Sequence, residues 1–390
     1  MRYLSFTLLA LCLSLCTSVG AQSTLTGRII DSLTKDPVAF ATVYLDGTSV
    51  GEITGNDGTF SLKGVRPPAT LVISHLAYRT MNLKIVRSGS LGDLVMRPQE
   101  AVISGVEVTD GNLRGKTLAE FFRLMIGTDE WAEKSAILND EVLQFDRDYT
   151  VRTTAVSNDF MRNILKKRNR PSARWNEDET VYSYERSTNL KAKTRGVMKV
   201  RLPHLGYTLG MDLSTFLSEY KNGYTSYLGT FYFESDPEVN ESHLRNRARA
   251  YYGSGMHFAR ALLSGTLEEN GFMVVAVTED GLKKQGAMPE VDLQKFLVED
   301  ENGINYLIGL EGRELAILYY ADGRSRPVPR AKWKRKQPRQ SRLRVRGNKC
   351  MILPGGVFGD TNMVFLGDIG SRKLAWALPA DFEAPEDIND

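Results

Sequence analysis

The stretch LTGRIIDSLTKDPVAFATVYLDGTSVGEITGNDGTFSL, residues 25–62, decides the fold class of the N-terminal part of the chain. Short runs rich in β-branched and aromatic residues alternate here with the turn-forming pairs Asp46-Gly47 and Asp57-Gly58, which accept the backbone angles of tight connections. Pro67-Pro68 marks a further break. The pattern predicts strands at 25–30, 38–45, 59–62, 70–74 and 82–86, with a closing strand at 102–108. Short strands at this spacing are typical of a compact β-sandwich.

A pattern of glycines, acids and small residues runs through the same stretch: Gly27, Asp31, Pro37, Ala41, Val43, Gly47, Thr48, Gly51, Thr54, Asp57, Gly58 and Phe60, continued by Ser74 and Tyr78. It resembles the carboxypeptidase regulatory-like domain, a transthyretin-like β-sandwich, over residues 22–108. The resemblance implies a non-catalytic attachment, of the kind found on peptidases and at the front of TonB-dependent outer-membrane transporters.

The first residues have the pattern of a secretory signal peptide. Arg2 gives a positive start, residues 4–15 are almost unbroken in apolar character, and small residues end at Ala21. We therefore expect residues 1–21 to be removed, with export to the periplasm or the outer membrane. The alternatives are a buried N-terminal helix and a lipoprotein modified at Cys16, which Leu15 in the preceding position disfavours. No window of about 18 apolar residues predicts a transmembrane segment.

Cysteine content and charge restrict the function further. Removal of Cys12 and Cys16 leaves Cys350 alone, so no disulfide forms within the mature chain. Cys350 lies in an apolar run and is interpreted as a buried hydrophobic residue rather than a nucleophile. The net charge of +3 across 390 residues gives no reason to expect a nucleic-acid partner.

Residues 113–390 predict a strand-rich α+β domain. A helix is expected from Thr117 onward and a mobile loop at 161–179. A second helix is expected at 254–263, with Ser254 as its N-cap and a break at Gly253. Strands are expected at 149–156, 198–202, 206–210, 225–234, 272–277, 305–310, 315–320, 342–353 and 363–366.

Several blocks of this region carry a second resemblance: residues 136–139, 205–207, 227–229, 250–254, 257–258 and 260–262, together with Arg247. They are similar to envelope proteins known only as carboxypeptidase-like regulatory-domain proteins. That resemblance implies a shared architecture and location and leaves the activity open.

No catalytic or cofactor motif is found in the sequence. The histidines His75, His204, His243 and His257 lack the spacing that zinc peptidases require. Gly253-Ser254-Gly255 is not a nucleophile elbow, and helix capping explains Ser254 better. The sequence therefore predicts no catalytic residue, no metal and no cofactor, which indicates a protein that is not an enzyme.

Two groups of residues are candidate ligand contacts. Arg247, His257 and Arg260 are close enough in sequence to hold a carboxylate or phosphate, although the arginines could equally satisfy buried carbonyl groups. Residues 324–346 contain eleven Lys and Arg and no Asp or Glu, with Lys334, Arg335 and Lys336 in succession. This basic segment predicts either a long solvated hairpin or loop, or a patch for anionic envelope lipid or polysaccharide.

These observations favour a non-catalytic exported cell-envelope protein that acts as a binding or structural module. Its expected partners are an envelope protein, a glycan or an anionic lipid, and its oligomeric state is open. One alternative is a peripheral adaptor that binds an anionic surface through the basic segment. The other is a hydrolase with an unrecognised site.

Overall fold

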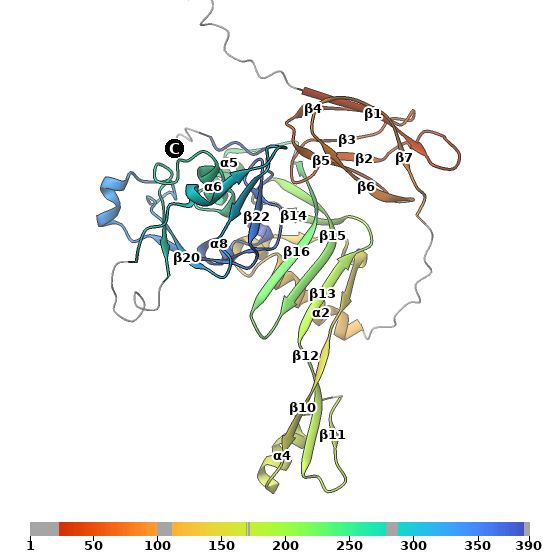
Figure 1. Ribbon diagram of the computed structural model, residues 1–390. Coiled ribbons are helices and arrows are strands. Elements are labelled where there is room, and N and C mark those ends of the chain that lie inside the picture. The colour runs from red at the N-terminus through yellow and green to blue at the C-terminus, as the bar shows by residue number, and fades with distance from the viewer. Residues whose placement is uncertain (1–22, 100–110, 169, 171, 278–287, 386–390) are drawn as a thin grey trace, which may run out of the picture. The chain divides into compact units, whose positions relative to one another are not determined.

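The computed structural model describes residues 23–99, 111–168, 170, 172–277 and 288–385 (Figure 1). They fall into two compact units that divide near residue 101. The N-terminal unit holds the described residues up to 99, except Gly47–Ser49, which group with the C-terminal unit.

The N-terminal unit consists of two β-sheets, with strand orders β4-β1-β7 and β3-β2-β5-β6. Apolar side chains from both sheets, including Leu25, Ile29, Val43 and Leu71, meet in one buried core. The β-sandwich predicted from the sequence is therefore confirmed. The strands are β1 (Ser23–Asp31), β2 (Thr42–Leu45), β3 (Gly51–Ile53), β4 (Thr59–Val65), β5 (Ala69–His75), β6 (Tyr78–Ile85) and β7 (Gly89–Met96).

The turn before β4 requires glycine at position 58. Gly58 has a φ of 73°, and a Cβ at this position would lie 2.5 Å from the carbonyl oxygen of Ile29. Asp57 supports the turn because its Oδ1 accepts a hydrogen bond from the backbone N–H of Thr59 at 3.0 Å. The turn expected from the sequence is thus confirmed, together with its steric reason.

Asp31 and Tyr78 connect the end of β1 to the start of β6. The Asp31 carboxylate accepts hydrogen bonds from the N–H groups of Leu33 and Thr34, at 2.6 and 3.1 Å. The Tyr78 hydroxyl donates to its other oxygen at 2.7 Å. The hydrogen bond from Tyr78 has the largest effect on the pKa of Asp31, followed by those from the backbone. All of them lower this pKa because they stabilise the ionised form. Both residues of the sequence pattern therefore have a structural role.

Two strands of the sandwich, β3 and β7, were not expected from the sequence. β7 contains Gly92 and Asp93, residue types that are depleted in strands, and it is held by parallel pairing with the distant β1. The closing strand expected at 102–108 lies outside the described residues.

The first part of the C-terminal unit is a six-stranded sheet of order β8-β14-β15-β13-β9, with β16 also paired to β15. Its strands are β8 (Ala136–Ile137), β9 (Leu143–Asp146), β13 (Asn189–Thr194), β14 (Met198–Leu202), β15 (Tyr207–Glu219) and β16 (Tyr224–Ser235). The helices are α2 (Gly111–Met125), α3 (Glu130–Lys134) and α5 (Glu241–Tyr251), with the short 3-10 helices η1 (Asp140–Val142) and η4 (Leu374–Trp376).

Helix α2 packs on this sheet through Phe121, whose ring lies 4.9 Å from that of Phe216. The helix begins six residues earlier than its predicted N-cap, Thr117. That residue is buried inside the helix, where its hydroxyl accepts a hydrogen bond from Arg147 at 3.2 Å. The predicted cap was wrong because a tertiary partner satisfies the side chain.

The second part contains two four-stranded sheets, β17-β20-β21-β24 and β18-β19-β22-β23. Helix α6 (Gly255–Leu263) packs its buried Phe258 and Leu262 into the same core as Ile317 and Leu343. The expected strand 342–353 is two strands. The elements are β17 (Phe272–Ala276), β18 (Leu297–Glu299), β19 (Asn305–Ile308), β20 (Glu314–Tyr319), β21 (Arg339–Val345), β22 (Lys349–Leu353), β23 (Val357–Phe358), β24 (Met363–Gly367), α8 (Asp368–Ser371), η2 (Leu293–Phe296) and η3 (Arg330–Arg335). The α+β prediction for this region is confirmed.

Residues 149–187, here called the arm, form a separate small sheet of order β10-β12-β11 with one helix. Its elements are β10 (Tyr149–Ala155), α4 (Asp159–Lys167), β11 (Arg174–Trp175) and β12 (Val181–Ser187). A structured helix thus stands where a mobile loop was expected. Asn189 clasps the base of the arm: its side chain accepts from the Asp148 N–H at 2.9 Å and donates to the Asp148 carboxylate at 2.7 Å.

None of the helices in the described ranges is both long and apolar enough to cross a membrane.

Candidate functional site

The turn between α5 and α6 has the structure expected from the sequence. Gly253 adopts a φ of 74° and separates the two helices. Ser254 is the N-cap of α6, and its hydroxyl accepts a hydrogen bond from the His257 N–H at 3.1 Å. Ser254 therefore has a capping role, because its hydroxyl compensates a free N–H of the first helical turn.

His257 is buried, and both of its ring nitrogens have partners within the chain. Nδ1 accepts from the Gly253 N–H at 3.0 Å, so the ring proton lies on Nε2 and is donated to Asn270 Oδ1 at 3.0 Å. The Asn270 amide group donates to Thr266, which fixes this orientation. Burial lowers the pKa of His257 to about 4, so the ring is neutral at pH 7.

Arg247 and Arg260 donate to backbone carbonyl groups in different places. Nε of Arg247 donates to Leu205 at 2.7 Å, and its guanidinium lies 3.8 Å from the ring centroid of Tyr207. Arg260 donates three hydrogen bonds of 2.8 Å to carbonyl oxygens in the 355–382 region. Arg260 and His257 both lie against the Tyr251 ring, at 5.4 and 4.8 Å from its centroid. Arg247 packs on Tyr207 and donates to backbone carbonyl groups near it, so the structure brings two of the three side chains to one ring and does not gather all three around one position.

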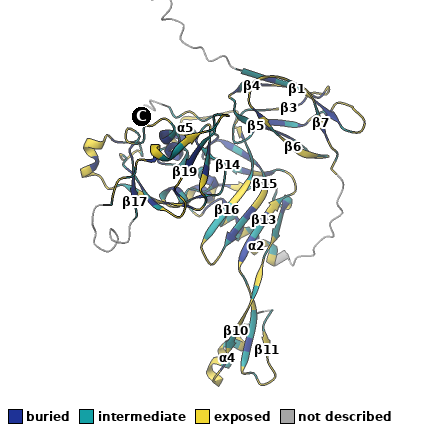
Figure 2. Ribbon diagram, viewed as in Figure 1, coloured by how far each residue is buried: buried dark blue, intermediate teal, exposed yellow. Residues whose placement is uncertain are grey.

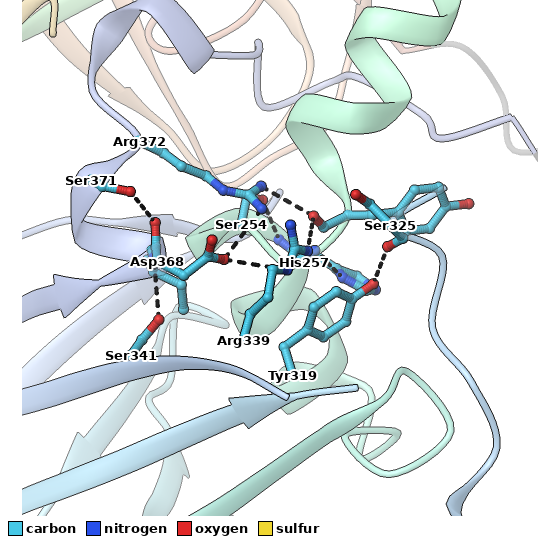
Figure 3. A network of polar contacts seen from close by, with 12 residues as sticks. Ser254, His257, Tyr319, Ser325, Arg339, Ser341, Asp368, Ser371 and Arg372 are labelled. Carbon is cyan, nitrogen blue, oxygen red and sulfur yellow. Dashed lines mark hydrogen bonds and ion pairs between the residues drawn. The ribbon is translucent and has the colours of Figure 1, made fainter. Parts of the chain in front are cut away.

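A polar cluster that sequence reasoning missed lies beside this turn (Figure 3). Arg339 on β21 and Arg372 after α8 both donate to the Tyr252 carbonyl oxygen, each at 3.1 Å. Both also approach the Asp368 carboxylate, at 3.6 and 3.4 Å. Burial lowers the pKa of Arg372 to about 10, which still leaves it charged at pH 7.

This cluster holds the helix break against two strands. A Cβ at Gly253 would collide with the guanidinium of Arg339 and lie 2.7 Å from the Tyr319 ring. The Tyr319 hydroxyl donates to the Ser325 carbonyl oxygen at 2.7 Å, and burial raises its pKa. The donors of Arg372 and His257 are engaged within the chain, so the arrangement is suited to rigid support rather than to proton transfer.

The four histidines belong to different elements or loops of the fold. His75 is the last residue of β5, and His243 completes the capping box of α5. The buried His204 approaches the Ala375 carbonyl oxygen at 2.7 Å, and burial lowers its pKa. Over the ranges that the structure describes, no group of three His, Cys, Asp or Glu side chains could hold a metal ion. Burial raises the pKa of the Cys350 thiol to about 11, so it is poorly nucleophilic.

The basic segment 324–346 is not one solvated hairpin but a turn, the 3-10 helix η3 and strand β21. Acidic residues outside the segment neutralise much of its charge. Arg330 pairs with Glu268 and Glu290 at 2.6 and 3.0 Å, and Arg342 pairs with Glu314 at 3.0 Å. Further partners are Glu314 for Arg344, Asp368 for Arg339 and the Tyr224 ring for Arg346.

Four cations of the segment are exposed, and within the described ranges their side chains have no hydrogen bond, ion pair or ring contact: Lys332, Lys334, Arg335 and Lys336, here called the basic cluster. They belong to η3 and its C-cap. Trp333 anchors η3, because it is buried, stacks on Tyr320 with ring centroids 4.4 Å apart and donates to the Val328 carbonyl oxygen. The neighbouring cations are thereby presented to solvent from a fixed turn.

A shallow hollow of about 590 Å³ lies over β9, β13 and β15. Lys191, Lys193 and Arg195 line it together with Asp146 and the apolar Leu217. Lys191 is engaged by Asp148 at 2.7 Å. Besides these three cations, the only titratable side chain in the lining of the hollow is one carboxylate. The hollow therefore does not provide the pair of an acid and a base that a hydrolase uses.

Three comparisons relate the chain to known proteins. Residues 25–109 match the family model of the CarboxypepD_reg-like domain. No curated protein matches the chain. A cohesin–X-dockerin complex of Acetivibrio cellulolyticus is 25% identical over 23% of this chain and 65% of that one, with a TM-score of 0.19, so the chain spans less than two thirds of it.

Two further solved structures show weaker similarity. A protein of Bacteroides fragilis described as membrane-associated and of unknown function is 13% identical over 55% of this chain and 96% of that one, with a TM-score of 0.16. A 9R-lipoxygenase of Cyanothece is 10% identical over 64% and 48%, with a TM-score of 0.16. Scores this low carry no argument about function. The family match and the two-sheet core agree, so the N-terminal unit belongs to the carboxypeptidase regulatory-like domain family.

Proposed function

We propose that this protein is an exported, non-catalytic cell-envelope module that binds an anionic, phosphate-bearing surface through the basic cluster. The signal-peptide pattern that ends at Ala21 supports export. The regulatory-like N-terminal unit supports a role other than catalysis, because its resemblance to this domain family implies a non-catalytic attachment.

One observation carries the proposal: the structure separates the paired cations of the basic segment from the four unpaired ones. Ion pairs with acidic residues neutralise the charges of Arg330, Arg342 and Arg344. The basic cluster is exposed and has no such partner among the described residues. In a 3-10 helix residues three apart share a side, so Lys332 and Arg335 lie together while Trp333 faces the interior.

Chemistry at the α5–α6 turn is the competing hypothesis, and its geometry offers little support for it. The ring nitrogens of His257 are both engaged, and the donors of Arg260 are directed at carbonyl oxygens. A hydrolase would need a free nucleophile or base within reach of a substrate. We therefore propose a structural role for Arg247, His257 and Arg260.

The test compares vesicles of phosphatidylcholine with vesicles that also contain phosphatidylglycerol. Each cation near an anionic surface contributes about 1 kcal/mol, so the triple variant Lys334→Glu, Arg335→Glu, Lys336→Glu should bind the anionic vesicles roughly 100-fold more weakly. Binding of the parent protein should also fall as salt rises. A lipopolysaccharide arm tests whether a glycan phosphate substitutes for the lipid headgroup.

The matched control reverses three exposed cations elsewhere, Lys63→Glu, Arg87→Glu and Lys221→Glu, and so changes the net charge equally. Its binding should remain within a few fold of the parent. Equal losses in both triple variants would show that total charge, not the basic cluster, governs binding. Far-ultraviolet circular dichroism verifies that each variant is folded.

A further inference from the structure

Helix α4 of the arm presents its apolar side chains to solvent. Phe160 is 76% exposed, Met161 37% and Ile164 39%, and none of the helix residues is buried. Residues three and four positions apart lie on one face of a helix, so Phe160 and Ile164 are neighbours and Met161 adjoins them. An amphipathic helix ordinarily buries this face against a core.

The opposite, polar side attaches α4 to the rest of the arm. Lys166 pairs with Glu179 at 2.7 Å, and Arg162 approaches the same carboxylate at 3.6 Å. A further ion pair, between Arg162 and Asp159, lies within the helix. Asn158 caps the helix by accepting a hydrogen bond from the Met161 N–H at 2.9 Å. The ion pairs therefore fix the helix with its apolar face pointing away from the arm.

The arm itself has little interior in which this face could be buried. Between 149 and 187, only Val156 and Tyr182 are buried among the described residues, and Figure 2 shows intermediate and exposed colours over most of β10, β11 and α4. Figure 1 shows α4 at the end of the β10–β12 hairpin remote from the six-stranded sheet. No other element of the described chain covers Phe160, which remains mostly in solvent.

The charge next to the apolar face is positive. Lys167 and Arg168 follow directly in sequence, are exposed, and have no side-chain partner among the residues described. The arm carries eight Lys and Arg against five Asp and Glu, and two of those acids are used by Arg162 and Lys166. Apolar side chains bordered by free cations complement the acyl boundary and the anionic headgroups of a lipid leaflet.

We propose that α4 is an interfacial membrane anchor, with Phe160, Met161 and Ile164 inserted at the headgroup boundary of an anionic leaflet and Lys167 and Arg168 on its phosphates. This site is independent of the basic cluster. Each contact alone gives reversible binding, whereas two together would give the combined signals that stable peripheral attachment needs.

The test uses the whole protein and vesicles of phosphatidylcholine and phosphatidylglycerol. Phe160→Asp with Ile164→Asp should lower vesicle affinity at least tenfold, because charged groups resist entry into the acyl boundary. The matched control, Leu33→Asp with Leu76→Asp, adds two carboxylates at side chains 79% and 96% exposed in the N-terminal unit and should bind as the parent does. Because no residue of α4 is buried, the variants should retain the parent's circular dichroism.

A second readout reports on α4 alone. Lipids that carry a nitroxide at the top of the acyl chain should quench more tryptophan fluorescence in the Phe160→Trp variant than in the parent protein. The added quenching would come from the new tryptophan in α4. This quenching should persist when the basic cluster is reversed. Unchanged vesicle affinity of the double aspartate variant, no added quenching, or equal binding to purely neutral vesicles would each overturn the proposal. If the vesicle affinity of the double aspartate variant were unchanged, a protein partner would instead have to account for the exposed apolar face of α4.

Discussion

The backbone N–H of Gly253 donates to Nδ1 of His257 across 3.0 Å, and this bond fixes both the tautomer of the ring and the path of the chain between α5 and α6. The residue that breaks the helix is thus also the donor that orients the buried histidine. Protonation of Nδ1 would remove the acceptor and place a charge in a buried site.

The stability of the protein should therefore depend on pH through His257. Its folded-state pKa of about 4 lies below the ordinary value of 6.5, so the unfolded chain binds the extra proton between these values. The free energy of unfolding should be highest above pH 6.5 and fall as the pH drops from 6.5 toward 4, by on the order of 3 kcal/mol. Denaturant titrations of the wild type and His257→Gln should differ in this window. Identical pH profiles would contradict the assignment.

Replacement of Gly253 by alanine should destabilise the fold severely. The new methyl group would meet Arg339 and Tyr319, and alanine would be held at a φ of 74°. We expect a loss of about 3 kcal/mol or more in denaturant unfolding, from backbone strain and steric overlap together.

Gly312 provides the matched control for this substitution. It has a φ of 71° and nothing within 4 Å of the position of a Cβ. Gly312→Ala should therefore cost only the backbone term, about 1 kcal/mol. If the two alanine variants were equally stable, the polar cluster around Gly253 would not be as rigid as described.

The N-terminal unit should fold without the rest of the chain. The described strands of both sheets and the core between them all lie within residues 23–99. A fragment of residues 22–108 should unfold in one cooperative transition, as expected for a domain with its own core. A non-cooperative melt or an insoluble fragment would argue against this boundary.

Export should be visible at the N-terminus of the protein. If the signal-peptide interpretation is correct, N-terminal sequencing of protein from the cell-envelope fraction will begin at Gln22. Full-length protein retained in the cytoplasm would contradict both export and the proposed function.

Local sequence chemistry predicted the elements whose cause is local. The Gly58 turn and the Ser254 cap depend on residues within a few positions of each other. Strand β7 was missed because its stability comes from parallel pairing with β1 and not from its own composition. The two strands are neighbours in the sheet but stand at opposite ends of the domain's sequence.

The polar groups were less predictable than the strands. Arg339 and Arg372 meet Tyr252 across 87 and 120 residues of sequence, so no local pattern relates them. The basic segment looked uncompensated because it contains no acid, yet Glu268, Glu290 and Glu314 reach it from elsewhere in the fold. Sequence could indicate that these cations were unusual, but only the fold separates the paired from the unpaired ones.

The clasp between Asp148 and Asn189 makes the arm an excursion that leaves and rejoins the body of the domain at a single point. The entropy of closing a loop grows only with the logarithm of its length, so a connection of roughly forty residues costs about 2 kcal/mol more than one of four. Insertions or deletions between Asp148 and Asn189 would therefore change the stability of the remaining fold very little. The length and the side chains of the arm could therefore change during evolution while the six-stranded sheet stayed the same.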